Sequence, residues 1–214
     1  INEGGVFSET GLLAGTAYNE DGDVEAGMGV DMGDADNDGW PDLFVTNFQW
    51  ETNTFYRNLG DATFVDETFS SGLGKGSIPY LSWGTRLVDL DNDGDRDVFI
   101  ANGHLESDVE EYENTTFAQR NQVFLNNGDG TFAESVPEPG TALDLRRVSR
   151  GAAFGDYDND GAVDILVNNI EDRATLLRNA GAAGGNWLQV RLVGGLSNAA
   201  ALGARVELAS GDLR

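Results

Sequence analysis

Residues 29–47 read GVDMGDADNDGWPDLFVTN, and the same pattern recurs without gaps at residues 84–102 and 151–169. Each copy has a glycine five residues before its first loop aspartate and an asparagine five residues after its last one. The copies start 55 and 67 residues apart, within the range of β-propeller blade repeats and longer than the coils of a short solenoid. We therefore take this repeat as the unit from which the fold is built.

A short apolar run follows the aspartate-rich part of each copy, at residues 43–45, 98–101 and 165–167. A strand with one wet face should alternate polar and apolar side chains, so an unbroken run indicates cover on both faces. Stacked blades of a β-propeller provide such cover, whereas a β-sandwich, the alternative, buries one face of each sheet. The sequence thus predicts an all-β fold: a β-propeller fragment of about three four-stranded blades, followed by the beginning of a C-terminal β domain.

Each repeat contains a loop of the form Asp-x-Asp-Asn-Asp-Gly-x-x-Asp. Calcium is a hard cation that takes about six to eight oxygen ligands, and carboxylates at alternate positions of a tight loop can converge on it. Glycine at position six permits the sharp turn, position seven can offer its carbonyl, and the aspartate at position nine closes the shell. Magnesium fits less well, because it prefers a small octahedral shell with several waters. The sequence predicts about three Ca²⁺ sites with the ligands Asp34, Asp36, Asp38, Trp40 and Asp42; Asp89, Asp91, Asp93, Asp95 and Asp97; and Asp156, Asp158, Asp160, Ala162 and Asp164.

Two other structures share part of this motif. An EF-hand needs a bidentate glutamate at position twelve and a helix on each side, but position twelve here is Val45, Ile100 or Val167, each inside an apolar run. An ordinary Asp-Asn-Asp-Gly turn needs no metal. Three copies with four carboxylates each disfavour that alternative, because unpaired carboxylates about 5 Å apart repel by roughly 1–3 kcal/mol per pair.

Composition excludes several classes of function. The 214 residues carry a formal net charge of −24, and twelve of the 23 Asp residues occupy the loop positions. Such a surface repels nucleic acid, whose phosphates need clustered Lys and Arg. No Cys is present, which rules out disulfides and thiolate metal sites. No apolar run approaches the roughly 18 residues of a membrane span. We expect no nucleic-acid partner and no membrane span in this fragment.

No set of side chains with the chemistry of a nucleophilic catalyst stands out. His104 is the only histidine, and without an oriented partner it cannot form a nucleophile–base set, so we interpret it as a loop-packing residue. Trp40, Trp50 and Trp83 would suit a sugar-stacking surface, although aromatic packing in the core is the favoured interpretation. We predict no catalytic residues: the chain is a binding or structural module, not an enzyme.

With these residues set out, the chain resembles FG-GAP/VCBS repeat proteins, whose β-propeller blades carry this loop; integrin α-subunit propellers hold related ones. The Asn-x-Gly-x-x-Thr-Phe segments at residues 58–64 and 126–132 look like the same repeats. Residues 186–194, NWLQVRLVG, and residues 202–206, LGARV, look like the start of an ASPIC/UnbV domain. This pairing is similar to bacterial secreted proteins and animal cartilage acidic proteins. The resemblance implies a propeller of about seven blades, of which about three are present, working in extracellular or cell-surface adhesion or recognition.

The predicted organisation follows the repeat. Residues 1–26 are the end of a preceding blade and a connector, residues 27–82, 83–149 and 150–185 are FG-GAP/VCBS blades, the second with an acidic insertion, and residues 186–214 start a truncated ASPIC/UnbV-like domain. We expect a calcium-binding module that recognises a protein or glycan ligand. Its location would be extracellular, periplasmic or at the cell surface, with a signal sequence upstream of Ile1. The alternative is a non-catalytic accessory domain of a secreted polysaccharide-degrading enzyme.

Overall fold

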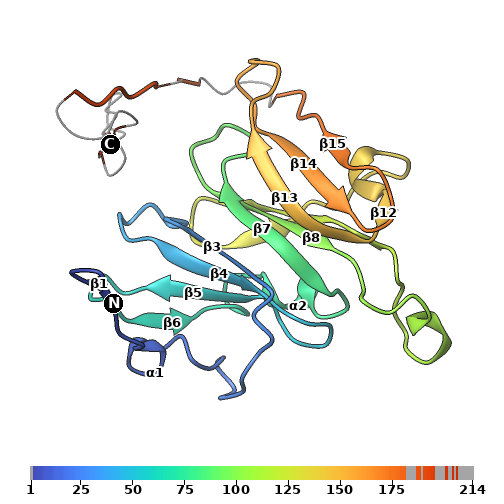
Figure 1. The fold of residues 1–214 in the computed structure, drawn as a ribbon, viewed down its shortest axis with the longest axis horizontal. Coiled ribbons are helices and arrows are strands. Elements are labelled where there is room, and N and C mark those ends of the chain that lie inside the picture. The colour runs from blue at the N-terminus through green and yellow to red at the C-terminus, as the bar shows by residue number, and fades with distance from the viewer. Residues whose placement is uncertain are drawn as a thin grey trace.

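Most of the regular structure is antiparallel β-sheet, and three large sheets follow one another along the chain (Figure 1). The computed structural model describes residues 2–181 and, beyond them, residues 187, 188, 190–195, 201, 204 and 206. The predicted all-β, propeller-type architecture is confirmed. The predicted start of an ASPIC/UnbV-like domain at residues 186–214 lies mostly outside the described residues and stays a prediction.

In each large sheet the first two strands are joined by an aspartate-rich loop. The first sheet contains, in spatial order, β3 (Gly29–Gly33), β4 (Asp42–Thr46), β5 (Thr54–Asn58) and β6 (Phe64–Asp66). The second contains β7 (Ser82–Val88), β8 (Asp97–Asn102), β10 (Gln122–Asn126) and β11 (Phe132–Glu134). The third has three strands within the described residues: β13 (Ser149–Gly155), β14 (Asp164–Asn169) and β15 (Thr175–Leu177).

Short elements fill the connections. Two ribbons pair β1 (Asn2–Glu3) with β2 (Val6–Phe7) and β9 (Gln119–Arg120) with β12 (Arg146–Arg147). The helical turns are α1 (Gly11–Ala14), α2 (Gly74–Ser77) and the 3₁₀ turns η1 (Val109–Glu111) and η2 (Ala142–Asp144). Among the described residues, no helix has the length and apolar character needed to cross a membrane.

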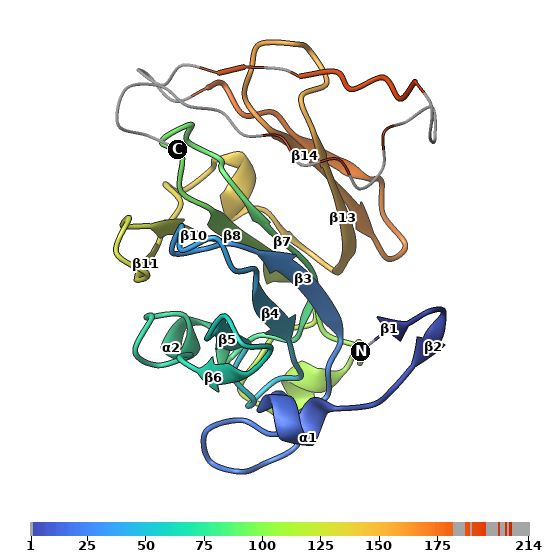
Figure 2. The same ribbon diagram turned by 90° about the vertical axis from the view of Figure 1, so that its left-hand side faces the viewer.

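The sheets are stacked in sequence order, with the second in the middle (Figure 2). The interface of the first and second sheets contains Phe44, Phe55, Leu87, Val98, Ile100 and Phe124. The interface of the second and third contains Phe99, Ala101, Val123, Ile165, Val167 and Leu177. Successive residues of β8 enter alternate interfaces, because neighbouring side chains of a strand point to opposite faces. Each face of the middle sheet therefore belongs to a separate apolar core.

The unbroken apolar runs predict strands covered on both faces, and the structure shows this only for the middle sheet. All six residues of β8 are buried. Burial alternates along β4, and β14 leaves Leu166 48% exposed. The cause is that, within the described residues, each outer sheet has another large sheet on one side only. Three stacked sheets with a fully buried middle strand are the arrangement of propeller blades, not of a two-sheet sandwich.

The glycine that opens each repeat lets neighbouring sheets approach closely. A Cβ on Gly29 would lie 2.2 Å from the carbonyl oxygen of Trp83, and one on Gly84 would lie 2.8 Å from the backbone nitrogen of Ala152. Heavy atoms that are not bonded cannot stand so close, so only a residue without Cβ fits. Gly151, at the same place in the third repeat, would meet only the side chain of its own sheet's Asn168, at 3.2 Å. In the first and second repeats this glycine is therefore a contact residue between blades.

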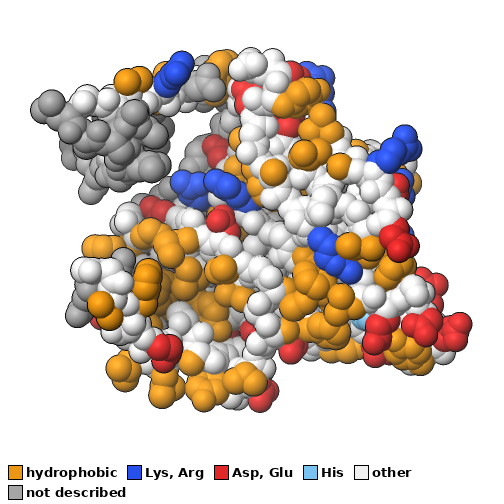
Figure 3. Space-filling view, viewed as in Figure 1, with side chains coloured by type: hydrophobic (Ala, Val, Ile, Leu, Met, Phe, Trp, Pro, Cys, Tyr) orange, Lys and Arg blue, Asp and Glu red, His pale blue; other side chains and the backbone are white. Residues whose placement is uncertain are grey.

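The insertion between β8 and β10 projects from the stack. It contains η1 and exposes the acidic residues Glu106, Asp108, Glu110, Glu111 and Glu113. Figure 3 shows acidic side chains gathered at this end of the molecule, while hydrophobic side chains gather over the β3–β6 sheet. The insertion also folds back on the first blade, because the indole N–H of Trp50 donates to the Glu113 carboxylate at 3.0 Å.

Candidate metal centres

Each aspartate-rich loop is a tight turn with two residues in the left-handed backbone region. Position four is Asn37 (φ 58°), Asn92 (φ 59°) or Asn159 (φ 61°), and position six is Gly39 (φ 93°), Gly94 (φ 100°) or Gly161 (φ 89°). Asparagine tolerates this region better than most residues, and glycine has no Cβ to clash there. The Asn and the Gly that the three copies share are thus requirements of the turn itself.

The carboxylate at position one closes the turn from inside. Asp34 accepts hydrogen bonds from the backbone N–H groups of Asp38 (3.1 Å) and Gly39 (3.0 Å). Asp89 and Asp156 accept the equivalent pair in their own loops at 3.0–3.3 Å. An aspartate turn without metal makes bonds of the same kind, so this feature shows how the carboxylate is oriented and does not by itself indicate an ion.

The aspartate at position nine ties the loop to the third strand of its sheet. Asp42 is fully buried and accepts the N–H of Ala35 at 2.9 Å and the N–H of Asn58 at 2.8 Å. The equivalent acceptors are Asp97, with Leu90 and Asn126, and Asp164, with Tyr157 and Asn179, at 2.8–3.0 Å. Because each carboxylate oxygen has two lone pairs, both oxygens keep a lone pair available for a cation.

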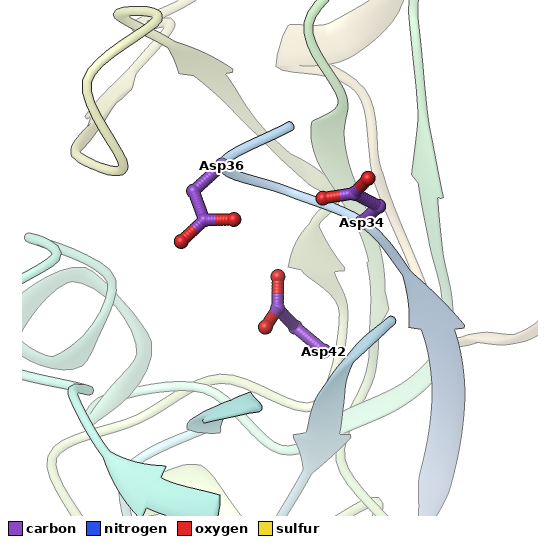
Figure 4. A group of neighbouring side chains, drawn as sticks. All are labelled: Asp34, Asp36 and Asp42. Carbon is purple, nitrogen blue, oxygen red and sulfur yellow. The ribbon is translucent and has the colours of Figure 1, made fainter. Parts of the chain in front are cut away.

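Three carboxylates converge in every loop. Positions one, three and nine each place an oxygen within 4.8 Å of the other two, in the groups Asp34, Asp36 and Asp42; Asp89, Asp91 and Asp97; and Asp156, Asp158 and Asp164. Figure 4 shows the first group, in which carboxylates from the end of β3, the loop and the start of β4 face a common space. The structure therefore brings together the predicted ligands of positions one, three and nine.

The predicted ligands at positions five and seven lie outside these groups. Asp38 accepts the N–H of Trp40 at 2.8 Å, and Asp93 and Asp160 accept the N–H of Asp95 and Ala162 at 2.9 and 3.0 Å. One oxygen of the position-five carboxylate thus supports the turn. Ligation by Asp38, Asp93 and Asp160, and by the carbonyls of Trp40, Asp95 and Ala162, stays a prediction.

Burial, with a contribution from neighbouring carboxylates, raises the pKa of the position-nine aspartate in the first two loops. Burial raises the pKa of Asp42 from 3.8 to about 6, and the negative charges of Asp36 and Asp38 add to the shift. Burial likewise raises the pKa of Asp97 to about 6, with Asp91 contributing. A cation next to such a group favours its charged form and removes the repulsion. The first two loops are therefore electrostatically suited to positive charge.

The second loop gives the most direct test of whether a metal ion fits. The Oδ1 atom of Asp91 is buried and has no hydrogen-bond partner. Leaving a buried acceptor unsatisfied costs about 1–3 kcal/mol, and more when the group is charged. A calcium ion would satisfy this oxygen, and the other converging ligands are oxygens of the hard type that calcium prefers. Bound there, it would neutralise the carboxylates and link the loop to the start of the next strand.

Comparison with known families agrees with this geometry. The profile of the FG-GAP-like repeat family matches residues 34–100 and again residues 89–167. Each match starts at the first aspartate of one loop and ends in the apolar strand behind the next loop, and together they span more than half of the chain. The chain belongs to the FG-GAP-like repeat family. No curated protein matches the sequence significantly, and the resemblances to ASPIC/UnbV and cartilage acidic proteins stay predictions.

The loops of neighbouring FG-GAP-like repeats are linked by side-chain amides. Asn37 donates to the Asp95 carboxylate at 2.6 Å, and Asn126 donates to the Ala35 carbonyl at 2.7 Å. The second and third loops are linked in the same way, by Asn92 to the Gly161 carbonyl at 3.2 Å and by Asn179 to the Leu90 carbonyl at 2.6 Å. The three candidate centres therefore form one hydrogen-bonded row across the stacked blades.

Sequence reasoning missed two kinds of residue at these centres. An asparagine recurs in every repeat at or just after the end of the third strand, as Asn58, Asn126 and Asn179. The recurrence is a signal in the sequence, but it does not predict the hydrogen bonds of these residues to the position-nine aspartate and the loop. Arg178 was also missed. It contacts Asp158 at 2.6 Å and Asp160 at 3.1 Å. Arg178 is 20 positions from Asp158 and 18 positions from Asp160 in the sequence. Only the pairing of the strands brings these residues together, so no local motif predicts the contact.

The weaker candidates of the sequence also have defined places. His104 is buried, packs edge-on against Phe48 and accepts the Glu106 N–H at 3.1 Å, so its predicted packing role is confirmed. Trp40 and Trp50 are 51% and 55% exposed, so the interpretation of these two as core residues is wrong. The reason is local: Trp40 follows the exposed loop glycine, and Trp50 occupies a left-handed turn position with φ 70°.

Proposed function

We propose that this chain is a calcium-binding β-propeller repeat module of an exported protein, working in protein or glycan recognition. The observation that carries the proposal is the same carboxylate triad at the same place in three successive blades. Turn geometry alone would not require three carboxylates to converge in each loop, because bringing them together costs repulsion. A divalent cation removes that cost and holds the loop to its strand.

The location follows from the affinity expected of such loops. Calcium sites of extracellular modules have dissociation constants up to about a millimolar. Sites of that strength would stay largely empty at cytosolic calcium levels, so we place the protein outside the cytosol, with an ASPIC/UnbV-like segment after the blades. An export signal in the full-length gene is the expected finding, and a gene without one would count against this location.

Recognition, not catalysis, is the proposed activity. The exposed indoles of Trp40 and Trp50 suit stacking against sugar rings or burial in a protein interface. No catalytic role is proposed for His104, whose Nδ1 is engaged with Glu106. Screening the chain against glycoside, ester and phosphoester substrates should show no turnover. Turnover abolished by a single Asp or His substitution would contradict this part of the proposal.

Removing calcium is the direct test of the metal sites. A ligand that binds only the folded state stabilises it by about 2.7 kcal/mol per site at 100 times its dissociation constant, a large share of a typical total of roughly 5–15 kcal/mol. Calorimetry should therefore show a marked fall in melting temperature after chelation, restored better by calcium than by magnesium. An unchanged melting temperature, with no calcium bound at millimolar concentration, would make the loops ordinary turns.

A matched pair of variants tests where the ions bind. Asp158→Ala removes one member of the third triad and should reduce the calcium stoichiometry from about three to about two. Asp172→Ala removes a surface ion pair with Arg147 at 2.9 Å, worth roughly 0–1 kcal/mol, and a hydrogen bond from the Arg173 N–H at 2.7 Å. Both lie outside the loops, so this variant should leave the stoichiometry unchanged. Equilibrium dialysis with elemental analysis measures both. Equal stoichiometry in the two variants would exclude the third loop as a site.

A further inference from the structure

The three loops share one motif, but different side chains lie beside their carboxylates. The residue just before the third-strand asparagine is Arg57 in the first repeat, Leu125 in the second and Arg178 in the third. The residue before it pairs, in every sheet, with the residue after the position-nine aspartate: Tyr56 with Leu43, Phe124 with Val98 and Leu177 with Ile165. The side chain of the following residue therefore starts from the same place in each sheet. At this one position, two of the sites therefore have an arginine beside them and the other has a leucine.

In the third repeat, that neighbour already occupies the carboxylates. The Nε atom of Arg178 lies 2.6 Å from Asp158 Oδ2, and its Nη2 atom lies 3.1 Å from Asp160 Oδ2. Asp158 is one of the three converging carboxylates of this loop. The Arg178 side chain is 54% exposed, so the guanidinium can move into water when another cation takes its place. The singly charged guanidinium of Arg178 therefore competes with a calcium ion for the Asp158 carboxylate.

In the first repeat the arginine pairs with an acid outside the loop, although its charge still acts on Asp36 and Asp42. In the second repeat no arginine stands at this position. The Nε atom of Arg57 lies 2.9 Å from Glu67, an acid outside the loop. Leu125 carries no charge, and the loop beside it contains the buried Asp91 oxygen that has no hydrogen-bond partner. Over the described parts of the chain, no Lys or Arg forms an ion pair with a carboxylate of the first or second loop.

We propose that the three loops bind calcium with unequal affinity, in the order second, first, third, and that Arg178 is the residue that weakens the third. The inference rests on the proposed calcium-binding function. An ion entering the third loop must displace the guanidinium from Asp158, whereas an ion entering the second loop gains an oxygen with no other partner. One unit charge within a few ångströms of a dication at the surface is expected to change its affinity by about tenfold. The third site would then fill only at higher calcium concentrations than the other two.

A calcium titration of the ¹⁵N-labelled 214-residue chain, followed by two-dimensional NMR, separates the three sites. The position-six amides of Gly39, Gly94 and Gly161 each donate to the position-one aspartate of their own loop, at 3.0, 3.1 and 3.0 Å. Each amide shift therefore reports the filling of its own site. In the unmodified chain the Gly94 signal should reach its midpoint first and the Gly161 signal last.

Two substitutions at the same repeat position complete the test. Arg178→Gln should lower the midpoint of the Gly161 signal by about tenfold and leave those of Gly39 and Gly94 within about twofold. Arg57→Gln, the matched control, should change the Gly39 midpoint by no more than about twofold, because Glu67 already holds that arginine. The Gly39 and Gly94 signals also verify that Arg178→Gln folds.

Three results would overturn the inference: a Gly161 midpoint at or below that of Gly94 in the unmodified chain, no shift of the Gly161 midpoint in Arg178→Gln, or an equal gain at the first site in Arg57→Gln. Movement of all three signals at one common midpoint would leave calcium binding intact and remove the ranking. If no glycine signal moves at millimolar calcium, the proposed function itself fails.

Discussion

At the scale of single residues, each position-nine aspartate has two roles. Asp97 is buried, accepts two backbone N–H groups and also belongs to a carboxylate triad. The asparagine bonded to it, Asn126, reaches across to the loop of the preceding blade. The proposed metal ligation and the packing of the blades therefore depend on the same short chain of hydrogen bonds, and a substitution in that chain should affect both.

Replacing Asn126 with alanine should destabilise the protein more than the equivalent change at Asn58. The Asn126 amide donates to the Ala35 and Arg96 carbonyls, and its oxygen accepts from Gly128. The Asn58 side chain makes only the two bonds within its own blade, to Pro41 and Gly60. With about 0.5–1.5 kcal/mol per hydrogen bond and a further cost for a buried unpaired carbonyl, Asn126→Ala should cost roughly 1 kcal/mol more. Urea unfolding of both variants measures the difference, and equal costs would show that the bond between blades contributes nothing.

The residue scale is also where the sequence was most informative. The spacing of the aspartates correctly placed positions one, three and nine together, because the fixed geometry of a tight turn determines where alternate side chains point. The contact of Arg178 with Asp158 could not be predicted in the same way. This contact depends on the pairing of the strands and on the rotamer of Arg178, and a local sequence pattern predicts neither.

At the scale of strands, the close approach of β7 and β13 requires a glycine on β7. A Cβ on Gly84 would meet the backbone of Arg150 and Ala152 at 2.8 Å, and backbone atoms cannot move aside as a flexible side chain can. At Gly151 the nearest atom is a side-chain oxygen of Asn168 at 3.2 Å. The same position of the repeat therefore requires glycine in the second blade but not in the third.

Gly84→Ala should therefore destabilise the chain, whereas Gly151→Ala should be tolerated. Forcing an extra methyl group into a tight contact costs typically about 1–3 kcal/mol, and the Gly151 substitution should stay below about 1 kcal/mol because Asn168 can adjust. Thermal unfolding of the two variants at saturating calcium makes the comparison. A tolerated Gly84→Ala would mean that the second and third blades separate at little cost.

Strand burial marks the limit of what the sequence could predict about the elements. The apolar runs correctly identified β4, β8 and β14 as strands, since β-branched and aromatic residues between turn signals favour them. They did not distinguish the fully buried β8 from β14, where Leu166 is half exposed. Burial of the second face of a strand depends on whether another sheet packs there, and the sequence of the strand itself does not predict that packing.

At the scale of the whole molecule, the loops concentrate a large part of a net charge of −24 in one row across the blades. Self-repulsion of this kind destabilises a compact state and is screened by salt. Calcium would neutralise the row locally, whereas sodium can only screen it. The charge that makes the row attractive to dications therefore also makes the ion-free molecule sensitive to ionic strength.

Sodium chloride should stabilise the chelated protein more than the calcium-loaded one. Raising ionic strength from about 0.01 M to about 1 M shortens the screening length from roughly 30 Å to roughly 3 Å, which weakens carboxylate repulsion only where calcium has not already removed it. Melting temperatures measured over this range, with and without saturating calcium, should show the steeper rise in the chelated sample. Parallel slopes would indicate that the loop charges do not limit stability.

The position-six amides have a consequence for chemical ageing. Every loop contains an Asp–Gly pair, the dipeptide at which a side-chain carboxyl most readily cyclises onto the following backbone nitrogen to form a succinimide and then an isoaspartyl bond. Here the nitrogen of Gly39 is held by Asp34, and the Asp38 carboxylate is held by the N–H of Trp40. Both groups must give up these hydrogen bonds to react, so the closed turn opposes cyclisation. If calcium binds as proposed, its loss should loosen the turn. Isoaspartate should then accumulate first in stored protein kept free of calcium, at the three peptide bonds that precede the loop glycines.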